Sequence, residues 1–299
     1  MGIFKIFGKG FVTANKKAKM LVYLWLVNFL FSLILVAPFY SLLQKDFSRS
    51  LIGERLIQGI DMLWLGDLVY KYQDVASLFL GWTLVPAILF LLLYIFLNGG
   101  IIGRIVAGEE KVNFSSFFGD CGKYFWRFLR VFLISLIGYI LVVGILGRVI
   151  SALTKALTKN ASTQWTLIIA SFLRLLILLL LFSVIKMFFD YVKVGLAAEQ
   201  SKKALRGTLL NFAFLGKRFF KAWGLFLLVG LMFIALSVIY LAVARILPKT
   251  GLIPMIIVFL WQQAYILAKA WTAVLSFSTE YHFLKIHKTP SDGSVHLTK

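Results

Sequence analysis

The composition of this 299-residue chain places it in a membrane. Hydrophobic residues make up 61% of the sequence and charged residues only 15%, whereas a soluble domain is about 45–50% apolar and about 25% charged. Disordered and collagen-like proteins are excluded by the same numbers. A disulfide scaffold is excluded because Cys121 is the only cysteine. The net charge of +20 therefore has to be compared first with the distribution of cations around membrane helices.

Six apolar segments are each long enough to cross a bilayer, which takes about 20 mostly apolar residues. Because lipid offers no hydrogen bonds to the backbone, these segments must be helices. The predicted spans are residues 20–44, 80–105, 128–150, 164–188, 221–245 and 252–279. We predict an all-α polytopic membrane helix bundle over residues 20–286, with a basic amphipathic arm at 1–19 and a polar, disordered tail at 287–299.

Three segments outside the spans carry apolar residues at helical spacing, namely residues 3–15, 50–70 and 198–214. In the first of them, Phe4, Phe7 and Phe11 alternate with lysines, as in helices that lie in the membrane interface. An ordinary flexible basic start is the alternative for the arm. We predict three interfacial amphipathic helices.

The cations are unevenly shared between the two sides of the predicted membrane. Most of the 32 Lys and Arg residues fall in the two terminal segments and in the loops after spans two and four. The positive-inside rule then places the N-terminus and the C-terminus in the cytoplasm of a bacterial inner membrane. This accounts for most of the net charge, so no nucleic acid is expected as a partner.

Two stretches of the sequence follow the same order: a span end, an acid, an amphipathic loop, and an aromatic-basic start of the next span. They begin at residues 99 and 190, with Glu109 and Glu199 as the acids. Both begin on the same side, which predicts a parallel repeat of two helical hairpins. Their aromatic-basic starts predict interfacial lipid anchors. These anchors are Trp126, Arg127, Arg130, Lys217, Arg218, Lys221 and Trp223. They either anchor the helices generically or form a dedicated lipid pocket.

Three parts of the sequence resemble a broad bacterial family. They are the glycine-rich span end from Gly99 to Glu110, the run from Val194 to Leu210 and the segment from Lys217 to Trp223. The family consists of uncharacterised six-helix inner-membrane proteins and includes the membrane domain fused to glycerophosphodiester phosphodiesterases. The resemblance implies a fold and an inner-membrane location. It implies no catalytic residue, because the sequence shows no counterpart of the hydrolase domain. Gly99 and Gly103 also form a GxxxG motif that permits close helix approach, within the chain or in a dimer.

Two cations interrupt the predicted spans: Arg174 in span four and Lys269 in span six. Ionisable groups at such depth are costly and usually have partners or functions. Gln262 and Gln263 of span six are candidate partners of Arg174. We therefore predict an intramembrane contact at these four residues, either with local hydrogen bonding and snorkelling or with a bound anion, lipid or partner carboxylate.

The sequence favours a non-catalytic scaffold or accessory subunit that binds membrane lipids, mainly anionic ones, or a partner membrane protein or second copy of itself. A transporter for an anionic or amphiphilic solute is the alternative, although the prolines leave no broken helix at the midplane. An enzyme is the third reading. His282, His287 and His296 have no ligand-spaced cysteine or acid pair nearby, so no metal, cofactor or catalytic residue is predicted.

Overall fold

The computed structural model describes residues 2–47, 76–109, 112–159, 163–199, 204–248 and 251–288, together with Gly66 and Tyr70. The predicted helix at 50–70 and the polar tail beyond residue 288 lie outside these ranges. Every regular element within them is helical: α1 (Ile3–Lys16), α2 (Ala18–Phe47), α5 (Ala76–Ala107), α6 (Phe114–Leu141), a π-helical turn (Val142–Leu146), α7 (Gly147–Thr158), α8 (Gln164–Ala198), α9 (Ala204–Gly216), α10 (Phe219–Ile246) and α11 (Leu252–His287).

The described residues contain six helices that are long and apolar enough to cross a membrane. They cover Ala18–Val36, Leu84–Ala107, Phe114–Thr158, Gln164–Ala198, Phe219–Ile246 and Leu252–His287. Each overlaps one predicted span, so the structure confirms the all-α class and the presence of six potential membrane helices.

Three of these helices extend well beyond their predicted ends. The third runs without a break from Phe114 to Thr158, about 68 Å at 1.5 Å per residue, whereas the hydrocarbon core is about 30 Å thick. The fourth continues to Ala198 and the sixth to His287. The predicted bounds stopped at charged residues, but charges do not end a helix when packing continues, and Met187, Tyr191 and Leu196 are fully buried.

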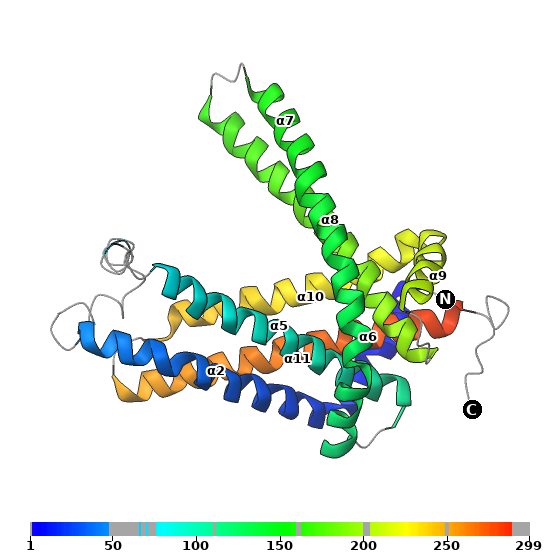
Figure 1. Cartoon of the computed structure of the whole chain (residues 1–299), viewed down its shortest axis with the longest axis horizontal. Coiled ribbons are helices and arrows are strands. Elements are labelled where there is room, and N and C mark those ends of the chain that lie inside the picture. The colour runs from blue at the N-terminus through cyan, green and yellow to red at the C-terminus, as the bar shows by residue number, and fades with distance from the viewer. Residues whose placement is uncertain are drawn as a thin grey trace.

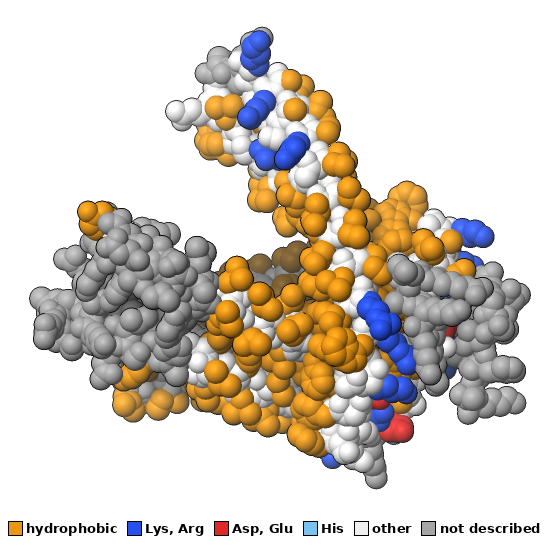
Figure 2. Space-filling model, in the orientation of Figure 1, with side chains coloured by type: hydrophobic (Ala, Val, Ile, Leu, Met, Phe, Trp, Pro, Cys, Tyr) orange, Lys and Arg blue, Asp and Glu red, His pale blue; other side chains and the backbone are white. Residues whose placement is uncertain are grey.

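The helices form a bundle from which one hairpin stands out (Figure 1). Helices α2, α5, α10 and α11 run side by side, while α6 with α7 and the first half of α8 leave the bundle at a steep angle. Residues 2 and 288 lie at the same end of the bundle, with α1, α9 and the ends of α5, α8 and α11. We call this the basic end. Figure 2 shows hydrophobic side chains over most of the visible described surface, with cations at the basic end and on the hairpin.

The N-terminal arm is helical and packs against α11 at the basic end. Ile6, Gly10 and Ala14 form its buried face, and the Thr13 hydroxyl lies 2.9 Å from Nε2 of His282. The opposite face exposes Phe4, which is 79% exposed. The arm therefore contributes to the core of the bundle, and its placement on the membrane surface stays a prediction.

The two halves of the predicted repeat differ in local structure. In the first half, the stretch before the aromatic-basic patch is continuous with the membrane helix α6. In the second half, it forms the separate helix α9, and a turn at Lys217 and Arg218 precedes α10. The structural repeat stays a prediction.

Candidate ligand-binding pocket

A cavity of about 140 Å³ lies between α5, α6 and α8. Its lining residues belong to α5, α6 and α8, and the ends of α5 and α8 lie at the basic end (Figure 1). Its lining comprises Leu91, Tyr94, Ile95 and Asn98 of α5, Phe132, Ser135 and Tyr139 of α6, and Lys186, Phe189, Asp190 and Lys193 of α8. We call this cavity the three-helix pocket.

The charged side of the pocket is built by a single face of α8. Lys186 is four residues before Asp190 and Lys193 is three residues after it, so helical geometry brings all three side chains together. The ammonium of Lys186 donates to Oδ2 of Asp190 at 2.5 Å, and that of Lys193 donates to Oδ1 at 2.9 Å. Asp190 is 3% exposed. A carboxylate at such depth is tolerated because both oxygens are paired with cations.

Asn98 supplies an unmatched acceptor on the α5 side of the pocket. Its side chain is 1% exposed, and its Oδ1 has no hydrogen-bond partner within the described part of the chain. Leaving a buried acceptor unsatisfied costs about 1–3 kcal/mol. The geometry therefore suits a donor from outside the chain. The Ser135 hydroxyl is less available, because it donates to the carbonyl of Phe132 at 2.7 Å.

The remaining walls of the pocket are mainly apolar, apart from the hydroxyl groups of Tyr94 and Tyr139. Leu91 and Ile95 of α5 face Phe132 of α6 and Phe189 of α8 around the cavity. An apolar cavity with a few convergent polar groups is the usual form of a small-molecule site. This pocket combines a cationic side with hydrophobic walls, which suits a ligand that is anionic at one end and apolar at the other.

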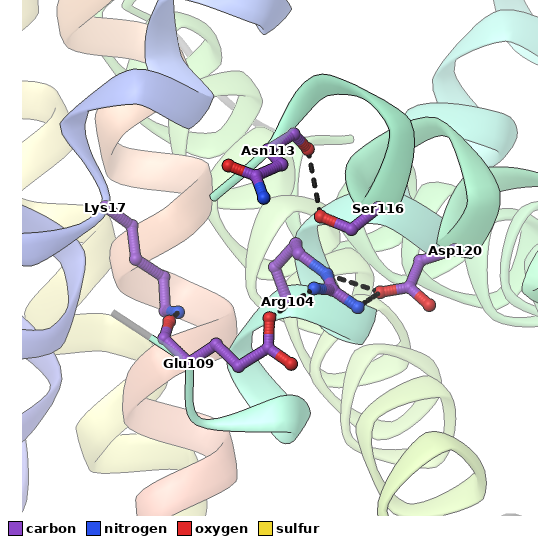
Figure 3. A network of polar contacts seen from close by, with 6 residues as sticks. All are labelled: Lys17, Arg104, Glu109, Asn113, Ser116 and Asp120. Atoms are coloured by element: carbon purple, nitrogen blue, oxygen red, sulfur yellow. Dashed lines mark hydrogen bonds and ion pairs between the residues drawn. The ribbon is translucent and has the colours of Figure 1, made fainter. Parts of the chain in front are cut away.

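A second polar network, shown in Figure 3, joins α5 to α6. Two guanidinium nitrogens of Arg104 lie 2.6 Å from Oδ2 of Asp120, and a third lies 2.9 Å from Oε2 of Glu109. Lys17 donates to the backbone carbonyl of Glu109 at 2.6 Å. Because these charged groups are paired with one another, the network holds the helices in place and offers no open site.

The GxxxG motif lies beside this network. A Cβ at Gly103 would come within 2.6 Å of the Asp120 carboxyl, and one at Gly99 within 3.0 Å of the Cys121 carbonyl. The glycines therefore permit close approach of α5 and α6 within one chain, which is one of the two uses that the sequence left open.

The structure does not bring together the four predicted intramembrane residues. Arg174 is half-buried and belongs to the first half of α8, and this half of the helix stands away from the bundle (Figure 1). The side-chain oxygen of Gln263 accepts a hydrogen bond from Nε1 of Trp25 at 2.9 Å. Gln262 and Lys269 are exposed. Among the described residues Gln263 is thus paired with Trp25, and the predicted intramembrane contact of Arg174 stays a prediction.

The predicted lipid anchors divide into two groups. Four are exposed and project outward: Trp126, Arg130, Lys217 and Lys221. The other three contact residues of the chain. Arg127 lies over the Tyr124 ring, Arg218 lies over the Phe214 ring, and Trp223 donates to the Ser183 hydroxyl at 3.2 Å. The first group is the more exposed of the two, although the Trp126 ring also packs edge-on against Phe125.

Sequence reasoning missed the three-helix pocket because the predicted fourth span ends at residue 188, so that Lys186 lies at its very end and Asp190 and Lys193 lie beyond it. Their spacing of four and three residues is a helical signal that could have continued the span. Asn98, an isolated amide in an otherwise apolar run, was a second signal.

Comparison with protein-family models, with curated proteins and with solved structures finds no match to this chain. Its function is therefore inferred from the chemistry of the pocket.

Proposed function

We propose that this multi-pass membrane protein is a non-catalytic accessory or scaffold protein that binds an anionic phospholipid head group in the three-helix pocket. The observation that carries the proposal is the convergence of two lysine ammonium groups and an unmatched buried amide on a cavity with apolar walls. Phosphate is the common anionic group of membranes, and each cation near it contributes about 1 kcal/mol to binding.

The depth of the pocket supports a lipid as its ligand. From Trp165 to Ile185 the only charged residue of α8 is Arg174, over about 30 Å of helix. Lys186 follows directly, so its ammonium lies at the level where the hydrocarbon core ends and lipid phosphates begin. The exposed apolar side chains of α6 and α8 beyond the pocket, such as Ile137, Ile140 and Leu179, offer a surface for the acyl chains.

The wider setting belongs to the same proposal. The charge distribution supports a bacterial inner membrane with both termini in the cytoplasm. The motif resemblance supports membership of the six-helix family that includes the domain fused to phosphodiesterases. An accessory role further requires a partner membrane protein or a second copy, for which the hairpin offers exposed apolar side chains such as Leu153, Leu157 and Phe172.

Lipid retention by a neutral version of the pocket tests the proposal. Changing Lys186→Gln, Asp190→Asn and Lys193→Gln together removes both cations and the carboxylate that pairs with them. The control changes two exposed lysines elsewhere, Lys155→Gln and Lys285→Gln. Native mass spectrometry in nanodiscs of phosphatidylcholine with phosphatidylglycerol should show roughly tenfold weaker retention of the anionic lipid in the triple variant only.

Equal retention by the triple variant and the control would overturn the proposal. If retention fell instead in Arg174→Ala or Lys269→Ala, the lipid contact would lie at the predicted intramembrane cations. Solute flux into liposomes that is lost in the triple variant would assign the pocket to a transporter.

A further inference from the structure

We infer that the three-helix pocket selects a phosphodiester head group with a single negative charge and a hydrogen-bond donor beyond the phosphate, in preference to a phosphate monoester or free phosphate. This inference rests on the proposed function and names the ligand class of the same site. Two independent features of the pocket support it: its charge balance and its unmatched acceptor.

The charge balance limits the ligand to one negative charge. Lys186 and Lys193 bring two positive charges to the pocket and Asp190 removes one. Glu280 of α11 does not line the cavity, but it interacts electrostatically with the same three side chains. An acidic residue can only lower the net positive charge around the pocket. The pocket therefore holds at most one net positive charge. A phosphodiester is balanced by that charge, whereas a dianionic monoester leaves excess negative charge in a partly buried site.

Asp190 has a specific role in this selection. Because it occupies one hydrogen-bonding position of each ammonium, it leaves each lysine with two further donors for a phosphate. It also places a negative charge next to the ligand, which repels a second negative charge on the phosphate. Asp190 is therefore the residue that sets the charge of the head group.

The unmatched acceptor requires a donor on the head group. Oδ1 of Asn98 is buried and has no hydrogen-bond partner within the described part of the chain, and Asn98 lines the same cavity as the two lysines. A head group whose phosphate contacts the lysines and whose hydroxyl or ammonium reaches Asn98 would satisfy both. A phosphate bearing only a methyl group would leave the amide unsatisfied.

The space available agrees with a head group. The cavity of about 140 Å³ is too small for acyl chains, since sites that enclose a drug-sized molecule occupy about 300–1,000 Å³. The chains would lie outside it, along the apolar surface of the hairpin. A soluble phosphodiester offers the same head-group chemistry, so the experiment has to separate lipid from soluble ligand.

The test compares ligands that differ by one feature at a time. Purified full-length protein in phosphatidylcholine nanodiscs is titrated with phosphatidylglycerol, phosphatidylmethanol and phosphatidic acid, and binding is measured by native mass spectrometry. We expect phosphatidylglycerol to bind about tenfold more tightly than phosphatidylmethanol, which has the same charge but no head-group donor. We expect phosphatidic acid to bind about tenfold less tightly than phosphatidylglycerol at a pH where it carries two charges.

Two variants assign these differences to residues. Asn98→Leu should remove the preference for phosphatidylglycerol over phosphatidylmethanol, and Asp190→Asn should shift the preference toward phosphatidic acid by about tenfold. Thermal unfolding in the same nanodiscs shows whether each variant is folded. If a variant does not fold, the comparison of the three lipids on the wild-type protein still tests the inference.

Inorganic phosphate and deacylated phosphatidylglycerol, added as competitors, distinguish the source of the ligand. Displacement of the lipid by the deacylated compound alone would assign the site to a soluble phosphodiester. Displacement by inorganic phosphate, or equal binding of all three lipids, would overturn this inference and leave the proposed function in place. Absence of any anionic lipid from the pocket would overturn both.

Discussion

Replacing Gly103 with alanine should loosen the contact between α5 and α6. Gly103 faces the ion-paired carboxyl of Asp120, and an added Cβ would lie 2.6 Å from both Cγ and Oδ2. The carboxyl has little freedom to retreat, because its Oδ2 accepts from two nitrogens of Arg104 at 2.6 Å. Either the helices separate or the ion pair stretches.

The size of the effect follows from two opposing contributions. Overpacking a tight contact costs about 1–3 kcal/mol, and the high end is expected here since the neighbour is a buried, paired charge. Removing a glycine from a helix interior returns about 1 kcal/mol. The net loss of stability is therefore about 2 kcal/mol, which lowers the unfolding temperature by about 4–8 °C for a chain of this size.

Gly119→Ala is the matched control. Gly119 lies on the exposed face of α6, one residue before Asp120, and a Cβ added there would meet nothing within 4 Å. This change should gain about 1 kcal/mol from helix propensity alone. Thermal unfolding of both variants in the same detergent should place Gly103→Ala below the wild type and Gly119→Ala at or above it. Equal unfolding temperatures for the two variants would refute the packing described for α5 and α6.

Three further predictions concern other parts of the bundle. Gly10→Ala places a Cβ 2.9 Å from the backbone of α11, so amide hydrogen exchange over residues 3–16 should accelerate about tenfold. The control Gly8→Ala, whose added Cβ meets nothing within 4 Å, should leave the exchange rate unchanged. Equal exchange rates in the two variants would contradict the packing of α1 against α11. Trp25→Phe removes the hydrogen bond to Gln263 and should cost about 1 kcal/mol, measured as a lower unfolding temperature; no change would mean that α2 and α11 do not meet there. Cys121 is fully buried, so a maleimide should label it only after unfolding, and rapid labelling of the native protein would show that α6 is packed differently.

The number and class of the membrane helices could be predicted from the sequence because the physical constraint is local. An apolar run such as residues 20–44 must satisfy its own backbone hydrogen bonds in lipid, whatever it packs against. The ends of the helices were predicted less well, since residues 114–127 and 189–198 are amphipathic or charged. Whether such segments continue a helix depends on what covers them, as α9 and α11 do for the end of α8.

The candidate site was even harder to predict from the sequence than the helix ends. Arg174 and Lys269 were singled out because a cation within an apolar run is visible in one dimension. The structure places Arg174 on the protruding hairpin and Lys269 on the exposed surface, while Lys186, Asp190 and Lys193 meet Asn98 across a cavity. The two sides of that cavity are about ninety residues apart in the chain, so no local pattern could connect them.

The sequence by itself determined the membrane class, the six potential spans and the expected orientation of the basic segments, because hydrophobic length and the placement of cations act on each segment separately. Only the tertiary structure decided which helices are neighbours. It turned the GxxxG motif into an intramolecular contact, paired Arg104 with Asp120, and enclosed a charged pocket between α5, α6 and α8. The physical reason is that helix packing depends on the matching of whole surfaces, and residues distant in the chain contribute to each surface.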